Sequence, residues 1–221
     1  MSVPSRYLTL PDGVDVAHEI EVRRSRFLCL LRRAPDEEAA RALLAEARRA
    51  HHAARHHCSA WIIGADRGLQ RSSDDGEPSG TAGAPMLAVL HGHAPGPGDE
   101  ALSDVAAVVV RWFGGVLLGA GGLVRAYSDA VSAALDEAPL LVRERVLLRR
   151  VAVDHAGAGR LEHELRRTDA VVRGVEHAAD GATLVVGVTP EGDAALTAWL
   201  DARGLRATDG GVDHVDRPLR R

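Results

Sequence analysis

The stretch 105–127, VAAVVVRWFGGVLLGAGGLVRAY, constrains the fold more than any other part of the chain. It begins with an unbroken apolar run, which is typical of a strand buried on both faces of a sheet. Arg111, Trp112 and Phe113 follow, and then five glycines lie within nine residues: Gly114, Gly115, Gly119, Gly121 and Gly122. Dense glycine indicates positive φ angles or a close approach of the backbone to another group. The pattern predicts a central strand, a glycine loop and a helix over about 121–137.

The glycine loop lacks the residues that two nucleotide-binding motifs require. A dinucleotide fingerprint needs a third glycine, and Val124 stands at that position. A P-loop needs a lysine after its last glycine, and the chain contains no lysine. We therefore expect no cofactor. The backbone N–H groups near Gly121 and Gly122 are still able to bind an anion at the start of the helix. Arg111 and Arg125 would supply positive charge beside it.

Composition and charge narrow the class of protein. The 221 residues are 46% hydrophobic, which is enough for a sizeable core. The formal net charge is −4, so the chain has no overall attraction to nucleic acid or to an anionic membrane. The chain has two cysteines, Cys29 and Cys58, which lie far apart in the sequence. So few cysteines predict no disulfide framework, which is typical of proteins in a reducing cytoplasm. No apolar run reaches the roughly 20 residues of a membrane span. We therefore expect a cytoplasmic protein that does not associate with membranes.

The first fifty residues predict two strands and a helix. Apolar and polar residues alternate within 14–33, which favours two half-buried strands. Arg23, Arg24 and Arg26 lie where the strands meet, and this cluster is either a solvated turn or an anion site. A helix is predicted over 36–50, because acidic residues occupy its first turn and apolar residues recur with helical spacing.

Four histidines and a cysteine lie within the eight residues 51–58. Were the helix to continue, His52 and His56 would share a face, as metal ligands can. However, the pattern of 58–63 already predicts a strand, and no H-E-x-x-H motif is present. We therefore interpret the segment as a polar connector and expect no metal. His56, next to Arg55, could donate a hydrogen bond to an anion or act as a general base.

A turn-rich segment over 72–86 holds three carboxylates within four residues: Asp74, Asp75 and Glu77. Clustered carboxylates suit hard cations, so one interpretation is a magnesium or polar-substrate site. The other is an acidic turn followed by Ser79 or Thr81 as the N-cap of a helix over 81–91. We favour the turn and cap, since the spacing of a calcium loop is absent. A Pro/Gly loop is predicted over 92–100.

The C-terminal part of the chain predicts a second domain. The composition changes after Pro139, and the order that follows is β-α-β-β-α-β. The second of these helices is expected to begin with Thr189 as its N-cap. This order is that of a ferredoxin-like sandwich. We therefore expect an α+β protein of two domains, 1–140 and 141–221.

Four segments together carry a resemblance: RSRF (24–27), HAARHHCSAW (52–61), SDDGEPSGTAGAPM (73–86) and VVVRWFGGVLLGAGGLVRAY (108–127). They resemble the IMPACT family, and most closely its bacterial YigZ-like branch. The resemblance implies an N-terminal domain with the fold of the second domain of ribosomal protein S-five. It also implies a C-terminal domain similar to the last domain of elongation factor G. Both folds recur in translation proteins.

The resemblance implies a non-enzymatic regulator that binds RNA, the ribosome or a translation-related protein partner. The arginines of the N-terminal domain would then contact phosphates: Arg23, Arg24, Arg26, Arg55, Arg111 and Arg125. The alternative is an enzyme acting on an anionic or phosphorylated small molecule, with the acidic turn holding magnesium and the glycine loop holding the anion. A third interpretation is a protein-interaction module whose polar residues only shape its loops.

One structural observation separates these hypotheses. Five residues are expected to converge if a ligand binds: Arg55, His56, Asp74, Glu77 and Arg111. A shared open cleft would favour ligand binding. Separate buried hydrogen-bonded pairs would favour a structural role.

Overall fold

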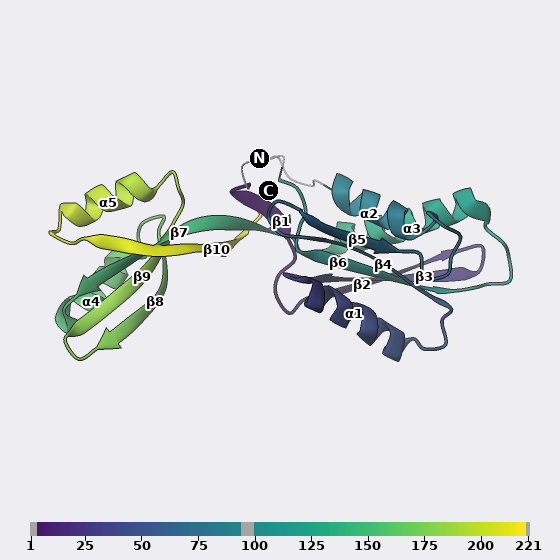
Figure 1. Cartoon of the computed structure of the whole chain (residues 1–221), viewed down its shortest axis with the longest axis horizontal. Helices are drawn as coiled ribbons and strands as arrows, with labels where there is room; N and C mark the ends of the chain where they lie inside the picture. The colour runs from purple at the N-terminus through teal and green to yellow at the C-terminus, as the bar shows by residue number, and fades with distance from the viewer. Residues whose placement is uncertain (1–3, 94–99, 220–221) are drawn as a thin grey trace. The chain divides into compact units, whose positions relative to one another are not determined.

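The structure is a computed structural model that describes residues 4–93 and 100–219. These residues form two compact units. Unit 1 comprises residues 4–142 and 217–219, and unit 2 comprises residues Arg143–Asp216. Both units contain helices and strands, which confirms the α+β class (Figure 1). Most of the loop predicted over 92–100 lies outside the described residues.

Unit 1 is built on a five-stranded sheet in the order β2-β3-β6-β4-β5. Its strands are β2 (Asp15–Val22), β3 (Ser25–Arg33), β4 (His56–Ile63), β5 (Leu69–Ser73) and β6 (Val105–Trp112). All neighbouring pairs are antiparallel. The predicted central strand is confirmed, since β6 lies between β3 and β4 and is buried from Val105 to Arg111. A short strand, β1 (Arg6–Thr9), precedes this sheet in the chain.

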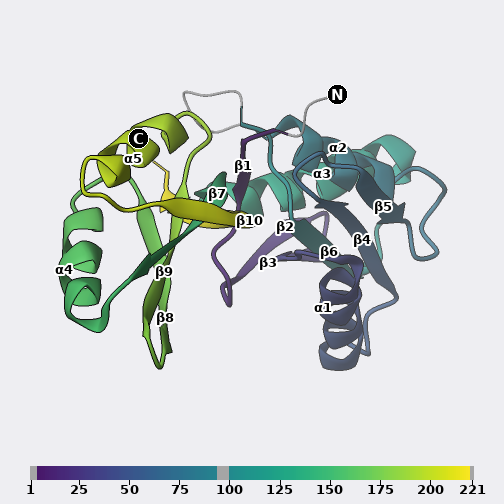
Figure 2. The same ribbon diagram turned by 60° about the vertical axis from the view of Figure 1, so that its left-hand side comes forward.

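Three helices cover the two faces of this sheet, α1 (Glu37–Ala50), α2 (Gly83–Gly92) and α3 (Gly119–Glu137). The helices α2 and α3 pack on one face, and α1 packs on the other (Figures 1 and 2). Alternate residues of β6 therefore point into different cores: Val109 meets α3, whereas Val110 meets α1. No helix of the described chain is long and apolar enough to cross a membrane.

The strand register decides which polar residues meet at the end of β6. Arg111 lies opposite Phe27 on β3 and opposite His56 on β4, so these three side chains share the α2/α3 face. Arg26 lies opposite Trp112 and belongs to the α1 face. The predicted helix over 36–50 ends at Ala50, and the following strand begins at His56, two residues earlier than expected. His52 and His56 therefore do not share a helix face.

Unit 2 has the predicted β-α-β-β-α-β order. Its elements are β7 (Leu141–Val153), α4 (His155–Leu165), β8 (Val171–Ala178), β9 (Gly181–Val188), α5 (Asp193–Asp201) and β10 (Ala207–Pro218). The strands run β8-β9-β7, and β10 pairs with β7. This is the arrangement of a ferredoxin-like sheet. Its apolar core includes Leu161, Leu184 and Leu200.

One helix start in unit 2 was predicted wrongly. Thr189 does not cap α5, which begins at Asp193 with Gly192 as its N-cap. The Thr189 carbonyl and hydroxyl oxygens both accept from the Gly192 N–H, at 3.0 and 3.2 Å. Thr189 therefore stabilises the turn before α5 and does not cap the helix. A threonine side-chain oxygen can accept from a free N–H group in a turn as well as from one at a helix start.

Candidate functional site

A cleft of about 340 Å³ opens at the end of β6 in unit 1. Its polar wall carries four of the five residues expected to converge: Arg55, His56, Glu77 and Arg111. Its other wall is apolar, with Phe113, Leu117, Leu118 and Leu123. The first residues of α3, Gly119 and Ala120, complete it. The four residues were chosen from the sequence, and strand pairing explains part of their convergence, because His56 at the start of β4 lies opposite Arg111 near the end of β6.

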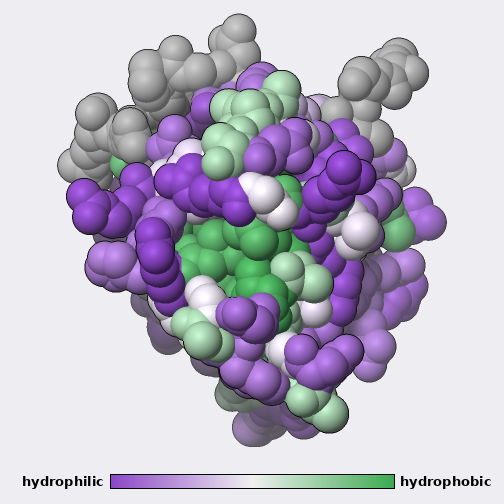
Figure 3. Space-filling view, turned by 90° about the vertical axis from the view of Figure 1, so that its left-hand side faces the viewer, coloured by the Kyte–Doolittle hydropathy of each residue, from purple (hydrophilic) through white to green (hydrophobic). Residues whose placement is uncertain are grey.

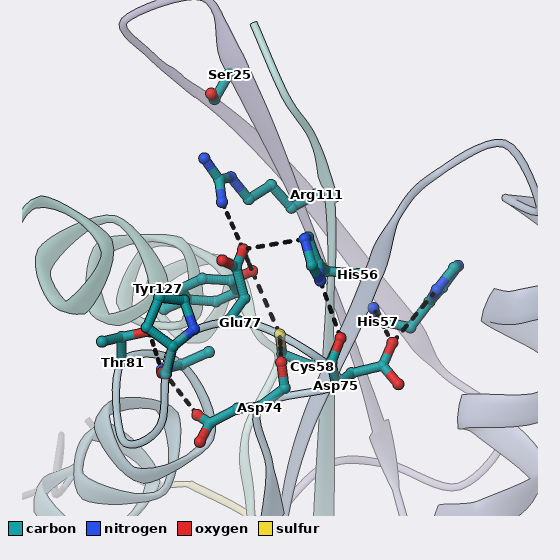
Figure 4. A network of polar contacts seen from close by, with 12 residues as sticks. Ser25, His56, His57, Cys58, Asp74, Asp75, Glu77, Thr81, Arg111 and Tyr127 are labelled. Carbon is teal, nitrogen blue, oxygen red and sulfur yellow. Dashed lines mark hydrogen bonds and ion pairs between the residues drawn. The ribbon is translucent and has the colours of Figure 1, made fainter. Parts of the chain in front are cut away.

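A chain of buried polar contacts lies behind the polar wall (Figure 4). The Arg111 Nη1 group donates to Glu77 Oε1 at 2.6 Å, and the Tyr127 hydroxyl donates to the same oxygen at 2.8 Å. The Cys58 thiol donates to Tyr127 at 3.3 Å. The two charges neutralise each other within the protein, and both side chains are more than nine-tenths buried.

Burial controls the ionisation of the neutral members of this chain. Burial raises the pKa of the Cys58 thiol to about 12, and the nearby carboxylates add to the effect. Burial likewise raises the pKa of Tyr127, and its contacts with Cys58 and Glu77 raise it further. Burial also raises the pKa of Cys29. The thiols and the phenol are therefore protonated at neutral pH and are not nucleophiles.

Asp74 does not line the cleft. Its carboxylate accepts hydrogen bonds from the N–H groups of Gly80, Ala82 and Gly83, at 2.8, 3.0 and 2.8 Å. Partial burial raises the pKa of Asp74, but these three bonds outweigh that effect and leave its pKa below the usual value. Asp74 thus closes the start of α2 from a distance of eight residues in the chain.

The predicted cap of α2 is therefore wrong. Thr81 is buried and donates its hydroxyl to the Pro78 carbonyl at 2.6 Å, and α2 begins two residues later with Ala82 as its N-cap. Local spacing pointed to Thr81, whereas the fold supplies a carboxylate, which binds amide groups more strongly than a neutral hydroxyl does. This is also the strongest reason to interpret the acidic turn as structural.

Asp75 joins the turn to β4 and α1. Its carboxylate accepts from Arg48 at 2.6 Å and from the His57 backbone N–H at 2.7 Å. Its carbonyl lies 2.9 Å from His56 Nδ1. Burial lowers the pKa of His57, although a bond to the His51 carbonyl and the Asp75 charge raise it in part. Among the described residues, no group of three or more His, Cys, Asp or Glu side chains is arranged to hold a metal ion.

The glycines serve different purposes. Gly114 packs against the backbone of the β2–β3 turn, and a Cβ there would overlap the Arg24 carbonyl group. Its N–H donates to the Ser25 hydroxyl at 3.2 Å. Gly115 has a φ of +84°, which favours glycine. Gly121 and Gly122 lie in the first turn of α3 but do not line the cleft, so Gly119 and Ala120 take the place expected for them.

Two of the predicted arginines lie away from the cleft. Arg26 forms a two-bond pair with Glu19, at 3.0 and 2.7 Å, and its guanidinium lies over Trp112 on the α1 face. Arg125 is exposed on α3. A strand period of two residues places Arg26 and Phe27 on opposite faces, so the RSRF segment could not be assigned to one site before the register was known.

Sequence reasoning missed the apolar wall. Leu117 is 82% exposed and Phe113 is 48% exposed, which is unusual for large apolar side chains of a folded protein. The only signal in the sequence was the presence of bulky residues inside a loop of glycines. A glycine loop is usually interpreted through its backbone, so its side chains were overlooked.

A second cleft, of about 400 Å³, lies in unit 2. Figure 3 shows hydrophobic residues at the floor of a hollow that is rimmed by hydrophilic side chains. The charged residues of this cleft neutralise one another, since Glu164 pairs with both Arg160 and Arg203, at 2.9 and 3.0 Å. The unit 1 cleft differs, because Arg55 forms no ion pair with any described residue.

Together the fold and the cleft define an α+β protein with a ligand-sized cleft on its N-terminal unit and a ferredoxin-like C-terminal unit. The family model of the Impact N-terminal domain matches residues 23–135, and a domain of unknown function, DUF1949, matches residues 151–203. The chain belongs to the IMPACT family, as its four segments predicted.

The similar proteins have the same family name. The chain is 38% identical over 171 residues to IMPACT family member YvyE of Bacillus subtilis (strain 168), which covers 77% of this chain and 75% of that protein. It is 49% identical over 117 residues to IMPACT family member YigZ of Escherichia coli (strain K12), covering 52% and 54%. A solved structure titled "Crystal structure of an hypothetical protein" is 33% identical, with a TM-score of 0.63 over 92% of this chain and 97% of that one.

Proposed function

We propose that this chain is a non-enzymatic regulatory protein of the IMPACT type that acts in translation by binding RNA, ribosomal RNA included. The observation that carries the proposal is the turn between β2 and β3. It consists of two residues only, Arg23 and Arg24, since Val22 already pairs with Ser25. Both arginines are exposed, and neither forms an ion pair within the described part of the chain.

This turn is strained for the residues it contains. The φ angles are +47° at Arg23 and +68° at Arg24, in the left-handed region. Turns of this kind favour Asn-Gly, because a Cβ in that region costs about 1–2 kcal/mol per residue. Strain of this size is common where a functional side chain is required. Two unpaired guanidinium groups at a sheet corner are suited to binding phosphates.

The turn lies at the same end of the sheet as the cleft. Gly114 packs directly on the Arg24 backbone, so the glycine loop supports the turn. Arg55 adds a third unpaired cation just before β4, at that end. In a chain with a net charge of −4, RNA binding requires such a local cluster. The exposed ring of Phe113 adds a surface on which a base can stack.

The enzyme alternative has no comparable support. Asp74 and Asp75 are hydrogen-bonded to backbone amides, and Glu77 is neutralised by Arg111. The carboxylates expected to hold magnesium therefore already have partners within the protein. The cysteine thiols have raised pKa values because they are buried.

The test is a double variant, Arg23→Asn with Arg24→Gly. It removes two positive charges and introduces the dipeptide that this turn favours, so the fold should become more stable by about 1 kcal/mol. Binding of a fluorescent single-stranded RNA would be measured by anisotropy between about 50 and 200 mM salt. We expect the affinity to fall about tenfold at the lower salt, and the salt dependence to weaken because two phosphate contacts are lost.

The matched control is Arg167→Gln with Arg206→Gln in unit 2, which removes two exposed arginines that form no ion pair with the described residues. The control should leave the affinity unchanged. No RNA binding at low salt, or equal binding by the wild type and the turn variant, would overturn the proposal. In that case a protein partner would become the leading hypothesis.

A further inference from the structure

The cleft of unit 1 contains a buried cation with unused hydrogen-bond donors. Arg111 is 6% exposed, and its one hydrogen bond with the described residues runs from Nη1 to Glu77. Its Nε atom is buried and has no hydrogen-bond partner in this part of the chain. A guanidinium has five N–H donors, and leaving buried donors unmade costs free energy. Arg111 also lines the cleft, so guanidinium N–H groups that Glu77 does not use can donate to an acceptor there.

The start of α3 opens into the same cleft. No side chain of the described residues caps this helix, whose N-cap is Leu118, and no acidic residue lies in its first turn. Gly119 and Ala120 line the cleft beside the polar wall. The free amides and the dipole of a 19-residue helix favour an anion there. Arg55, which has no ion pair in the described structure, lies on that polar wall.

The apolar wall indicates what the anion is attached to. The Phe113 ring is 48% exposed and lies 5.8 Å from the Arg111 guanidinium carbon. Leu117 is 82% exposed beside it. A flat aromatic group can stack on such a ring while its attached anion reaches the cationic end. The volume of about 340 Å³ lies within the range of small-molecule sites.

We infer that this cleft binds a nucleoside monophosphate unit. The phosphate monoester lies between Arg111, Arg55 and the first amides of α3, and the base stacks against Phe113. Because Glu77 neutralises Arg111, Arg55 and the start of α3 supply the positive charge of the site. The Arg111 donors that Glu77 does not use suit the several acceptor oxygens of a phosphate monoester. The site requires neither the dinucleotide fingerprint nor the P-loop, because arginines and a helix start bind the phosphate in their place.

The nucleoside monophosphate can be a free mononucleotide or the phosphorylated 5′ end of an RNA strand. The second source deepens the proposed function and rests on it, since the turn arginines would hold the strand that leaves the cleft. The first source is independent of RNA binding.

The experiment is calorimetric titration of the full chain with AMP, adenosine and inorganic phosphate. We expect AMP to bind at least tenfold more tightly than either of the other two, because only AMP occupies both ends of the cleft. No binding of AMP would overturn the inference. Equal binding of AMP and inorganic phosphate would also overturn it, since the base would then have no site.

Two variants in one helical turn provide the structural test. Ala120→Asp adds a carboxylate inside the cleft, and Gly121→Asp adds one on the same turn outside it. Both positions are exposed in the first turn of α3, where the dipole favours an acidic residue, so both variants should fold. We expect Ala120→Asp to weaken AMP binding more than tenfold and Gly121→Asp to weaken it less than threefold. If both variants weakened AMP binding equally, the placement of the site in this cleft would be overturned.

An RNA arm separates the two sources and keeps this inference apart from the proposed function. If the RNA end is the source, RNA with a 5′-phosphate should bind at least fivefold more tightly than the same RNA with a 5′-hydroxyl. Ala120→Asp should remove that preference, whereas Arg23→Asn with Arg24→Gly should weaken both RNAs. AMP binding without RNA binding would sustain the cleft as a mononucleotide site and overturn the proposed function. RNA binding without AMP binding or end preference would do the reverse.

Discussion

The helices α2 and α3 lie on the same face of one sheet, but their N-termini are treated differently. At the start of α2, the Asp74 carboxylate binds the N–H groups of Ala82 and Gly83. At the start of α3, none of the side chains that the structure describes binds the first amides, and Gly119 and Ala120 line a cleft. One helix start is therefore closed by the protein, and the other is open to a ligand.

The comparison reverses what the two segments suggest when each is considered alone. The acidic turn before α2 has the composition of a cation site, but its carboxylates hold the loop, the helix start and β4 in place. The glycine loop before α3 has no stock motif, but it borders the free amides, the exposed Phe113 and the buried Arg111. Unused donors, more than polar composition, mark the site.

The largest expected effect concerns the buried ion pair between Arg111 and Glu77 on the polar wall of the cleft. Arg111→Met leaves the Glu77 charge buried without a counter-charge, which costs about 3–5 kcal/mol in systems of this kind. The measurement is the free energy of unfolding in urea at neutral pH. Adding Glu77→Gln should recover at least half of the loss, because the neutral amide can still accept from Tyr127. A loss below about 1 kcal/mol in the single variant would show that water reaches the pair.

The next effect tests the closed helix start. Asp74→Ala removes three amide hydrogen bonds, so we expect a loss of about 2 kcal/mol in the free energy of unfolding. Asp74→Asn keeps an acceptor oxygen and should lose roughly half as much. If both variants unfold at the wild-type urea concentration, α2 does not depend on the distant cap.

The same residue predicts a dependence on pH. The pKa of Asp74 is lowered in the folded protein, so its contribution is fully present above the unfolded pKa of about 3.9 and is lost as the pH falls through the folded value. The wild type should therefore exceed Asp74→Asn in stability at pH 7, and the difference should shrink as the pH falls below about 4. Urea unfolding of both proteins across this range measures the difference. A stability difference that stays constant across this pH range would contradict the lowered pKa of Asp74.

The smallest effect compares the two helix starts directly. Ala84 and Ala120 are exposed and occupy equivalent places, each two residues after the N-cap. Ala120→Asp should stabilise the protein by about 0.3–1 kcal/mol, because nothing yet neutralises the start of α3. Ala84→Asp should have no effect or destabilise slightly, since Asp74 already lies there. Thermal unfolding of the two variants measures the contrast, and equal shifts would contradict it.

Elements with strong local signals were predictable. The buried run of β6, the stripe of α1 and the β-α-β-β-α-β order follow from periodicity and turn residues. The helix caps were less predictable. Thr81 and Thr189 have the right chemistry, but Asp74 and a local turn use the N–H groups differently, and that choice depends on contacts outside the window of a cap motif.

The sequence by itself determined the family, the α+β class and most of the residues on the polar wall, because these depend on local patterning and on residues that recur together. Only the tertiary structure decided that Arg26 and Arg111 lie on opposite faces of the sheet, since that depends on strand register. It also decided that Asp74 closes α2 while the start of α3 stays open. Hydrogen-bond partners are assigned by contacts between distant segments, and no local pattern records them.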